Sequence, residues 1–235
     1  MAKIGDALKK AVELKTGEED RSKARSTSPL MNANRRKIFQ FLCMNPCSHL
    51  DMISSNVKLS RSSVSWHLDS LMENGYVQSY PDSRGRVFAP KGLVPNKDVA
   101  VFNVLNMKEC ERIYKLILRT PGTDSNNLLR ETGMKAGSSK TCIRSLVVAG
   151  LIPRVMDGRH ARYFPTQRYR DMLRDGKTAH KGFIRLLLRK LADEHLRPEL
   201  YDMKGVDTVI EIRLLGQKER ITVPQRKDIE SSGDR

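Results

Sequence analysis

The sequence repeats one pattern at a fixed spacing of 75 residues, so that residue n corresponds to residue n + 75. The correspondence runs through both copies without an insertion or deletion. Apolar residues, prolines and glycines agree in type, in the pairs Ile38 with Ile113, Pro46 with Pro121, Ile53 with Leu128, Leu68 with Ile143, Leu71 with Leu146, Gly75 with Gly150, Phe88 with Tyr163 and Pro90 with Pro165. Because loop lengths agree as well as apolar positions, we interpret the pattern as an internal duplication of one structural unit.

The length and the apolar content allow more than one compact unit. The chain has 235 residues, of which 39% are hydrophobic. A typical domain has about 100 to 200 residues, and small cores suffice for units of this size. We therefore expect the copies to form two domains, over residues 28–95 and 99–166.

The chain is strongly basic, with a net charge of +16 and a pI near 9.9. Lys and Arg side chains that neutralise phosphates release condensed counterions, so a polyanion is the expected partner. No stretch approaches the roughly 18 consecutive apolar residues of a membrane span, and the N-terminus lacks the apolar block of a signal peptide. We expect a soluble, cytoplasmic protein with no membrane partner.

The four cysteines are Cys43, Cys47, Cys110 and Cys142. They are too few and too scattered for a disulfide scaffold, so reduced thiols are expected, with Cys43 and Cys142 serving as small core residues. Cys43 and Cys47 with His49 suggest a metal or redox sensor as an alternative, but their spacing fits no standard zinc pattern. The sequence predicts neither a metal site nor a cofactor.

Three helices are expected in the first copy. The first carries Ile38 on its buried face and stops at Pro46, and Ser48 with Asp51 resembles a capping box that opens the second. Ser60 is a good N-cap for the third helix, whose inward side chains are Val64, Leu68, Leu71 and Met72, and Gly75 suits its C-terminal cap.

A β-hairpin, or wing, follows in each copy. The segments YVQSY and RVFA flank the turn from Pro81 to Gly85, and LIPRV and ARYF flank the turn at Asp157-Gly158. In the second copy we expect Asn106 and Glu109 to cap the first helix and Thr123 to open the next.

The segments outside the two copies are predicted separately. Residues 1–27 are expected to form an amphipathic helix and a polar linker. Residues 167–235 predict two helices, interrupted at Asp175-Gly176, and a β-hairpin from the run DTVIEIRLL, GQKE, RITV. The expected fold class is mainly α with small β-hairpin wings, two tandem winged helix-turn-helix domains and a C-terminal helical and hairpin region.

The third helix of such a unit packs one face on its domain and presents the other to the major groove of DNA. The periodicity therefore nominates the outward side chains of these helices and the arginines of the wings as DNA contacts. They are Arg61, Ser62, Ser65, Trp66, Lys140, Thr141, Arg144, Arg84, Arg86, Arg159 and Arg162. Two alternatives stay open: the Trp66 ring folds against the wing or a neighbouring domain, and the wing arginines are only solvated. For His67, partial burial explains the residue better than metal ligation.

The string LSRSSVSWHLDSLMENGYV resembles the helix-turn-helix and wing entry of ArsR-like and MarR-like transcription regulators. By that resemblance Ser60 to Gly75 is the recognition helix. GMKAGSSKTCIRSLVVAGLI in the second copy is similar, but Lys135 replaces the capping Ser60 and Ser139 replaces the inward Val64. The paired arrangement is similar to the tandem winged-helix regulators of archaea, a group that includes the euryarchaeal archaellum regulators.

These observations predict a sequence-specific, double-stranded DNA-binding transcription regulator. Its further expected partners are the transcription machinery and, through the C-terminal region, a second copy of the chain. The alternative is a protein-docking or architectural chromatin role without strong sequence specificity. RNA binding is less favoured because neither copy has an exposed aromatic platform. No phosphate loop, metal cluster or activated nucleophile is recognisable, so no enzymatic activity is expected.

Overall fold

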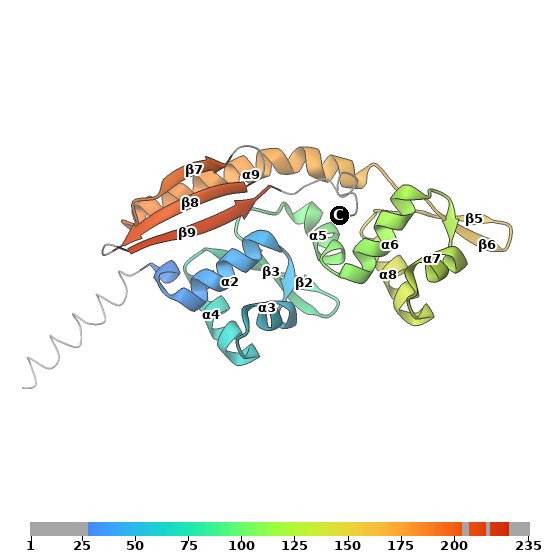
Figure 1. Cartoon of the computed structure of the whole chain (residues 1–235), viewed down its shortest axis with the longest axis horizontal. Helices are drawn as coiled ribbons and strands as arrows, with labels where there is room; N and C mark the ends of the chain where they lie inside the picture. The colour runs from blue at the N-terminus through green and yellow to red at the C-terminus, as the bar shows by residue number, and fades with distance from the viewer. Residues whose placement is uncertain (1–27, 204–206, 215–216, 226–235) are drawn as a thin grey trace, which may run out of the picture.

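The structure is a computed structural model that describes residues 28–203, 207–214 and 217–225. It is elongated, with two helical units side by side along its length and one long helix, α9, running past both (Figure 1). The helix and linker predicted for residues 1–27 lie outside the described residues.

The first unit contains three helices and a small antiparallel sheet with the strand order β1-β3-β2. Its elements are the 3-10 helix η1 (Pro29–Met31), α2 (Ala33–Met44), β1 (Ser48–His49), α3 (Leu50–Val57), α4 (Arg61–Glu73), β2 (Val77–Asp82) and β3 (Gly85–Pro90).

The second unit has the same element order and a sheet with the order β4-β6-β5. Its elements are α6 (Lys108–Arg119), β4 (Thr123–Asp124), α7 (Ser125–Thr132), α8 (Ala136–Val148), β5 (Arg154–Asp157) and β6 (His160–Tyr163). Each of its three helices begins and ends 75 residues after its counterpart, and the strand register is also repeated, since Ser48 pairs with Phe88 and Thr123 with Tyr163.

The helix ends differ in part from those expected. Ser60 caps α4 as predicted, because its Oγ accepts from the backbone N–H of Ser63 at 3.2 Å. The capping box at Ser48 was wrong: α3 begins after His49, and the Ser48 hydroxyl donates to the carbonyl of Asn45 at 2.6 Å. A side chain that can bond backward to the end of the preceding helix is not available to cap the next one.

The second unit shows two further differences. Asn106 does not cap α6; it ends a short helix that the sequence did not predict, α5 (Val99–Leu105), which follows the 3-10 helix η2 (Asn96–Asp98). Thr123 lies in β4 instead of opening α7, which is capped by the Asp124 carboxylate accepting from the N–H of Asn127 at 2.8 Å.

The predicted break at Asp175-Gly176 was wrong. A single helix, α9 (Arg168–Asp193), has 26 residues and runs through both positions without interruption. Asp175 is instead fixed by an ion pair of 2.7 Å with Lys97, which comes from η2. A glycine inside a helix costs roughly 1 kcal/mol relative to alanine, and tertiary packing commonly outweighs this cost. Here the packing of both halves of α9 against the two cores keeps the helix continuous.

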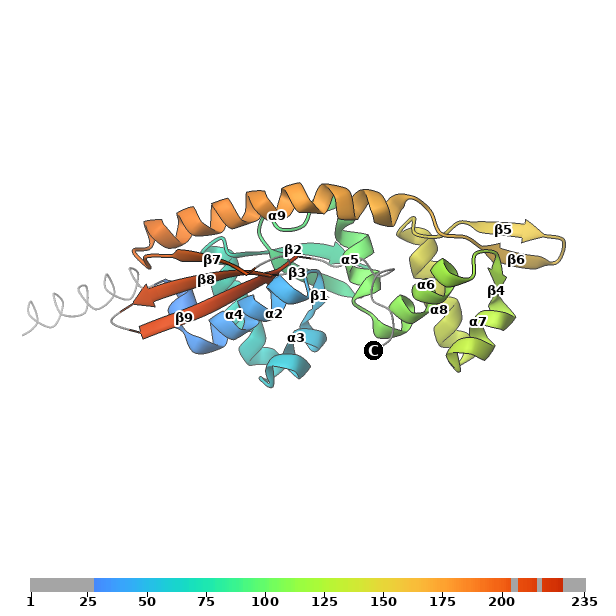
Figure 2. The same ribbon diagram turned by 45° about the horizontal axis from the view of Figure 1, so that its top comes forward.

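A third sheet follows α9, with the strand order β7-β8-β9. The predicted hairpin is formed by β8 (Asp207–Leu214) and β9 (Gln217–Pro224), and β7 (Glu199–Met203) adds a strand that the sequence did not predict. The sheet lies between α9 and the first unit (Figures 1 and 2). There the amide of Gln40 in α2 makes two hydrogen bonds of 2.7 Å with the backbone of Thr222 in β9.

The helix α9 contributes apolar side chains to both cores. Tyr169 and Met172, near its start, are buried in the core of the second unit. Phe183, Ile184, Leu187 and Leu191, near its end, are buried in the core of the first unit together with the apolar side chains of β8 and β9. Each such side chain stabilises its core by about 1.5 to 3 kcal/mol. Because both cores bury side chains of the same helix, α9 holds the two units together.

Gly75 follows α4 with a φ of +70°, and a Cβ added there would meet no atom within 4 Å. We expect Gly75→Ala to lower the free energy of unfolding by about 1 kcal/mol, through the backbone conformation alone. Urea denaturation measures the change. The control is Gly182→Ala in α9, where space is equally open but the backbone is helical, and where stability should rise by up to about 1 kcal/mol. A loss at both positions contradicts the argument.

Candidate nucleic-acid interface

The helix α4 has one buried and one exposed face. Val64, His67, Leu68 and Leu71 are buried in the first unit. The predicted contact residues Arg61, Ser62, Ser65 and Trp66 all lie on the exposed face. This division follows from the i, i+4, i+7 spacing of the apolar residues, and it leaves the polar face at the surface, where it can meet a groove.

Trp66 remains 63% exposed. The guanidinium of Arg35 lies 6.0 Å from the centroid of its ring, and the ring of His67 lies 4.9 Å away. A large apolar ring held at the surface beside a cation can contact a sugar or a thymine methyl.

Arg61 pairs with Asp51 of α3 at 2.9 Å, and both side chains are exposed. Exposed ion pairs contribute at most about 1 kcal/mol, so the guanidinium can exchange this carboxylate for a base edge or a phosphate at small cost. Asp51 therefore orients Arg61 without sequestering it.

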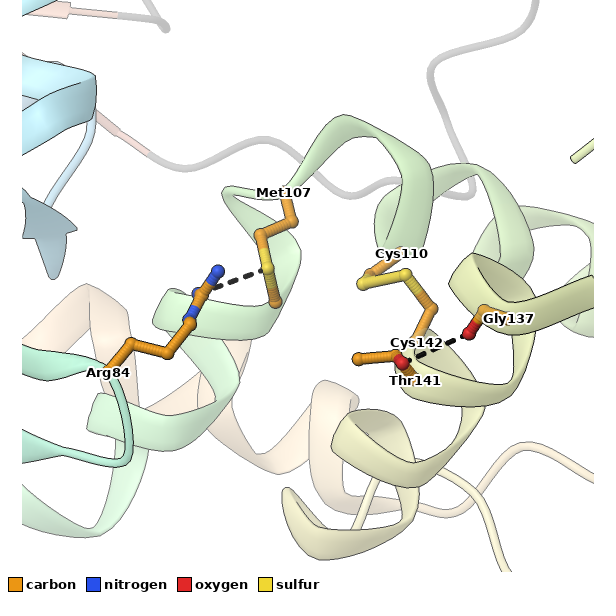
Figure 3. Close-up of a disulfide and its surroundings, with 6 residues drawn as sticks. All are labelled: Arg84, Met107, Cys110, Gly137, Thr141 and Cys142. Carbon is orange, nitrogen blue, oxygen red and sulfur yellow. Dashed lines mark hydrogen bonds between the residues drawn. A yellow bond between two sulfur atoms is a disulfide. The ribbon is translucent and has the colours of Figure 1, made fainter. Parts of the chain in front are cut away.

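The helix α8 is divided in the same way. Ser139, Cys142, Ile143 and Leu146 are buried, whereas the predicted contact residues Lys140, Thr141 and Arg144 are exposed. The Thr141 hydroxyl donates to the carbonyl of Gly137 at 3.0 Å (Figure 3). As expected, Ser139 takes the inward position of Val64, and Lys135 makes no side-chain capping bond.

Cys142 forms a disulfide with Cys110 of α6, with a Cα–Cα distance of 4.9 Å (Figure 3). The expectation of reduced thiols was wrong for this pair. The two residues are 32 positions apart in sequence, and only the packing of α6 against α8 brings them together. Cys43 is a buried thiol as expected, and burial raises its pKa, so it stays protonated.

The equivalent positions of the first unit hold Arg35 in α2 and His67 in α4. His67 is buried as expected, and desolvation together with the charge of Arg35 lowers its pKa. Arg35 also donates to the hydroxyl of Ser70 at 2.7 Å. Both units thus tie the first helix to the third at this point, by polar contacts in one and covalently in the other.

The four wing arginines differ in the residues that they contact. Arg84 points toward the second unit, where its guanidinium lies 3.2 Å from the sulfur of Met107 (Figure 3). Arg162 bonds Asp157 at 3.0 Å and the carbonyl of Gly122 at 3.3 Å, so it holds its own sheet together. Arg86 and Arg159 are exposed.

The first wing forms part of the contact between the units, which the sequence did not reveal. Asn103 of α5 donates to the carboxylate of Asp82 at 2.9 Å, and Asn106 donates to the carbonyl of Pro46. An asparagine that ends a helix carries no sequence signal for a partner 60 residues away.

A cavity of about 600 Å³ lies beside α8, between α8, α7 and the second wing. Four cationic side chains line it: Lys140, Arg144, Arg154 and Arg159. The sequence did not predict Arg154 as a contact, because this residue lies in the first strand of the predicted hairpin, directly before Val155 and Met156. This concentration of cations makes the face of α8 more basic than that of α4.

The helices α4 and α8 lie on the same side of the molecule, and α9 lies on the opposite side, in both views (Figures 1 and 2). Over the described residues no helix is long and apolar enough to cross a membrane, and no cluster of three or more metal-ligating side chains occurs.

Residues 31–78 match the family described as winged helix-turn-helix DNA-binding. The match extends from the end of η1 into β2 and includes all of α4. This segment of the chain is thus similar to winged helix-turn-helix DNA-binding domains, and α4 lies within it.

The other comparisons are less informative. No curated protein matches the sequence. A crystal structure of the DIP2311 protein from Corynebacterium diphtheriae is 15% identical over 57% of this chain and 26% of that chain, with a TM-score of 0.23. A crystal structure of ScpB from Mycobacterium tuberculosis is 13% identical over 60% of this chain and 94% of that chain, with a TM-score of 0.24. Both TM-scores are too low to establish a common fold.

We expect the double variant Cys110→Ala/Cys142→Ala to be less stable than the wild type under non-reducing conditions by roughly 3 kcal/mol, because a bridge across 32 residues restricts the unfolded chain. Denaturation with and without a thiol reductant measures this difference. Reductant should destabilise the wild type and the control Cys43→Ala but not the double variant. A wild type that is insensitive to reductant contradicts the assignment.

Proposed function

We propose that the protein is a sequence-specific, double-stranded DNA-binding transcription regulator in which both units act as winged helix-turn-helix domains. The observation that carries the proposal is that α4 and α8 are both amphipathic with an exposed polar face, and that both helices lie on the side of the molecule opposite α9 (Figures 1 and 2). The repeat of the boundaries of α2, α3 and α4 after 75 residues supports an internal duplication, as in the archaeal tandem regulators that the sequence resembles.

In this proposal the two units form a built-in pseudo-dimer. Dimeric helix-turn-helix proteins place two recognition helices in successive major grooves on one face of the duplex, about 10 base pairs apart. Here α9 performs the role of the dimer contact, because it is buried in both cores and holds the two helices within one chain.

The two recognition faces favour different contacts. The α4 face combines one guanidinium, Arg61, with the hydroxyls of Ser62 and Ser65 and the exposed ring of Trp66, which suits reading of base edges. The α8 face presents Lys140 and Arg144 beside the cation-lined cavity, which suits neutralisation of phosphates. We infer that the first unit supplies most of the specificity and the second much of the affinity.

A protein-docking function is the second candidate, because the second unit exposes apolar side chains. Val148 is 78% exposed and Met156 57% exposed, with Val155 beside Met156 on the wing. Exposed apolar side chains of this kind suit contact with a subunit of the transcription machinery or with another copy of the chain. Salt separates the two candidates: DNA binding through several phosphates weakens steeply between low and moderate salt, whereas an apolar protein contact responds little.

Substitutions of single arginines test the division of roles. Arg61→Ala should cost about 1 to 3 kcal/mol of affinity on the preferred duplex and less on random duplexes, whereas Arg159→Ala should weaken binding to all duplexes alike and reduce the salt slope by about 1. Fluorescence anisotropy over a salt series measures both. Arg185→Ala on the exposed side of α9 is the matched control and should have little effect. Equal losses on specific and random DNA for both contact variants refute the division.

The footprint on a selected site tests the pseudo-dimer. We expect hydroxyl-radical cleavage to show two protected segments on one face of the duplex, with centres about 10 base pairs apart. Because the two units have a fixed spacing, the affinity for DNA should also fall when the two protected segments are moved apart by half a helical turn, which places them on opposite faces of the duplex. Protection limited to one segment, with no dependence on spacing, shows that a single unit binds.

A further inference from the structure

The exposed face of α9 carries a row of cations, which we call the α9 row. Its members follow one another at intervals of four residues, and all their side chains are exposed: Lys177, Lys181, Arg185 and Arg189. Residues four apart are neighbours on one face of a helix, so the row extends along about 18 Å of its length. Arg170 and Arg174 are also exposed and continue the row toward the start of the helix.

The α9 row has no acidic counterpart on its own helix. No Asp or Glu occurs between Gly176 and Ala192. In the described part of the chain the ion pairs of α9 lie outside the row, at Arg168, at the turn around Asp175 and at Lys190. Like charges four residues apart destabilise a helix. The packing of α9 does not require them, because it uses the other face of the helix.

The α9 row points away from the recognition helices. The apolar side chains of α9 are buried in the two cores, and the exposed row lies on the face turned away from them. The helix itself lies on the side of the molecule opposite α4 and α8 (Figures 1 and 2). Because DNA is stiff over about 150 base pairs, a short duplex at α4 and α8 does not bend round to this row. The effect of Arg185→Ala on that duplex therefore stays small.

The spacing and the sign of these charges suit a phosphate backbone. One strand of B-DNA carries a phosphate per 3.4 Å of axis, so about five phosphates lie within the length of the row. Cations that contact phosphates position a duplex without reading its sequence. The aromatic side chains Tyr169 and Phe183 of this helix are buried, so the face offers no platform for stacking unpaired bases.

Two other polyanionic partners fit this face less well. The centre of a protein interface is rich in aromatic side chains and poor in lysine, and a helix that lies on a membrane turns an apolar face to the lipid. The apolar face of α9 is buried instead, and Leu186 is its one large apolar side chain that is more than half exposed.

We propose that the α9 row is a second DNA-binding surface, which holds the phosphate backbone of a duplex without regard to its sequence. Non-specific contacts of this kind give a Kd of roughly 1 to 100 µM at physiological salt. Together with the proposed function of α4 and α8, on which this further step rests, the row lets one molecule bridge two duplex segments. Two segments of one long DNA are then held as a loop.

Two variants with the same loss of charge test the surface. The α9 variant carries Lys177→Gln, Lys181→Gln, Arg185→Gln and Arg189→Gln. The α8 variant carries Lys140→Gln, Arg144→Gln, Arg154→Gln and Arg159→Gln, at the four cations that line the cavity beside α8. Glutamine has a helix propensity close to that of Lys and Arg, so α9 should keep its fold, which circular dichroism checks.

Bridging is measured with a short random-sequence duplex fixed to beads and a labelled copy of it in solution, at low salt. We expect the wild type to capture the labelled duplex on the beads. The α9 variant should still bind the beads but capture at least tenfold less of the labelled duplex. The variant Arg185→Lys/Arg189→Lys keeps the charges of the row and should capture as much as the wild type.

Fluorescence anisotropy on a single random-sequence duplex measures the row separately. Each phosphate contact contributes about 0.9 to the dependence of log affinity on log salt. Combining the α9 substitutions with those of the α8 variant should therefore reduce the salt slope of the α8 variant by about 3 to 4. If α4 and α8 do not bind DNA, the wild type does not bridge, but the α9 variant still loses its affinity for the single duplex. Failure of the proposed function is thus distinct from failure of this surface.

The proposal is overturned if the α9 variant bridges as the wild type does, or if the α9 substitutions leave the salt slope unchanged. It is also overturned if double-stranded RNA, polyglutamate or phosphatidylserine vesicles displace the duplex from the α8 variant at a lower concentration of negative charge than duplex DNA itself. If the α9 variant does not fold, Lys181→Gln/Arg185→Gln should reduce the slope by about 2, and an unchanged slope decides against the surface.

Discussion

The burial of one helix in two cores determines the architecture. The first half of α9 packs with α5, α6 and α8, and the second half packs with α2 and the C-terminal sheet, so neither core is complete without it. The ion pairs of Lys97 with Asp175 and of Arg168 with Asp98, both at 2.7 Å, fix the helix at the junction. Because side chains from one rigid element complete both cores, the two units cannot rotate freely, and the spacing between α4 and α8 becomes a property of the fold.

The contrast between local and non-local information explains what could be predicted from the sequence. The apolar periodicity of each unit, repeated after 75 residues, was sufficient to place α4 and α8 and to separate their buried from their exposed faces. Ser60 as a cap and Gly75 as a stop follow from local backbone chemistry. The exposure of Arg61, Lys140 and Arg144 could therefore be predicted, because residues opposite the buried apolar face of an amphipathic helix point toward solvent.

Features that depend on a distant partner could not be predicted in this way. The Cys110–Cys142 disulfide requires the packing of α6 on α8, and the continuous α9 requires two cores to outweigh the glycine at position 176. Asn106 has the same sequence character as a capping residue, yet it bonds the carbonyl of Pro46 in the other unit. Arg84 and Arg86 are close together in one hairpin, but Arg84 contacts Met107 of the second unit and His49 of the first, and these contacts are not evident from the sequence.

The two wings occupy corresponding positions in the two units but lie in different surroundings. The first wing contacts α5 through Asp82 and the start of α6 through Arg84 and Met107, and so helps to set the distance between the units. Among the described residues, the second wing projects from the end of the molecule and exposes β5 along its whole length (Figure 1). Its cations line an open cavity beside α8 instead of a contact between units. In the proposed function, the projecting second wing is free to follow the phosphate backbone, and the inequality of the two wings gives the pair of units a direction along DNA.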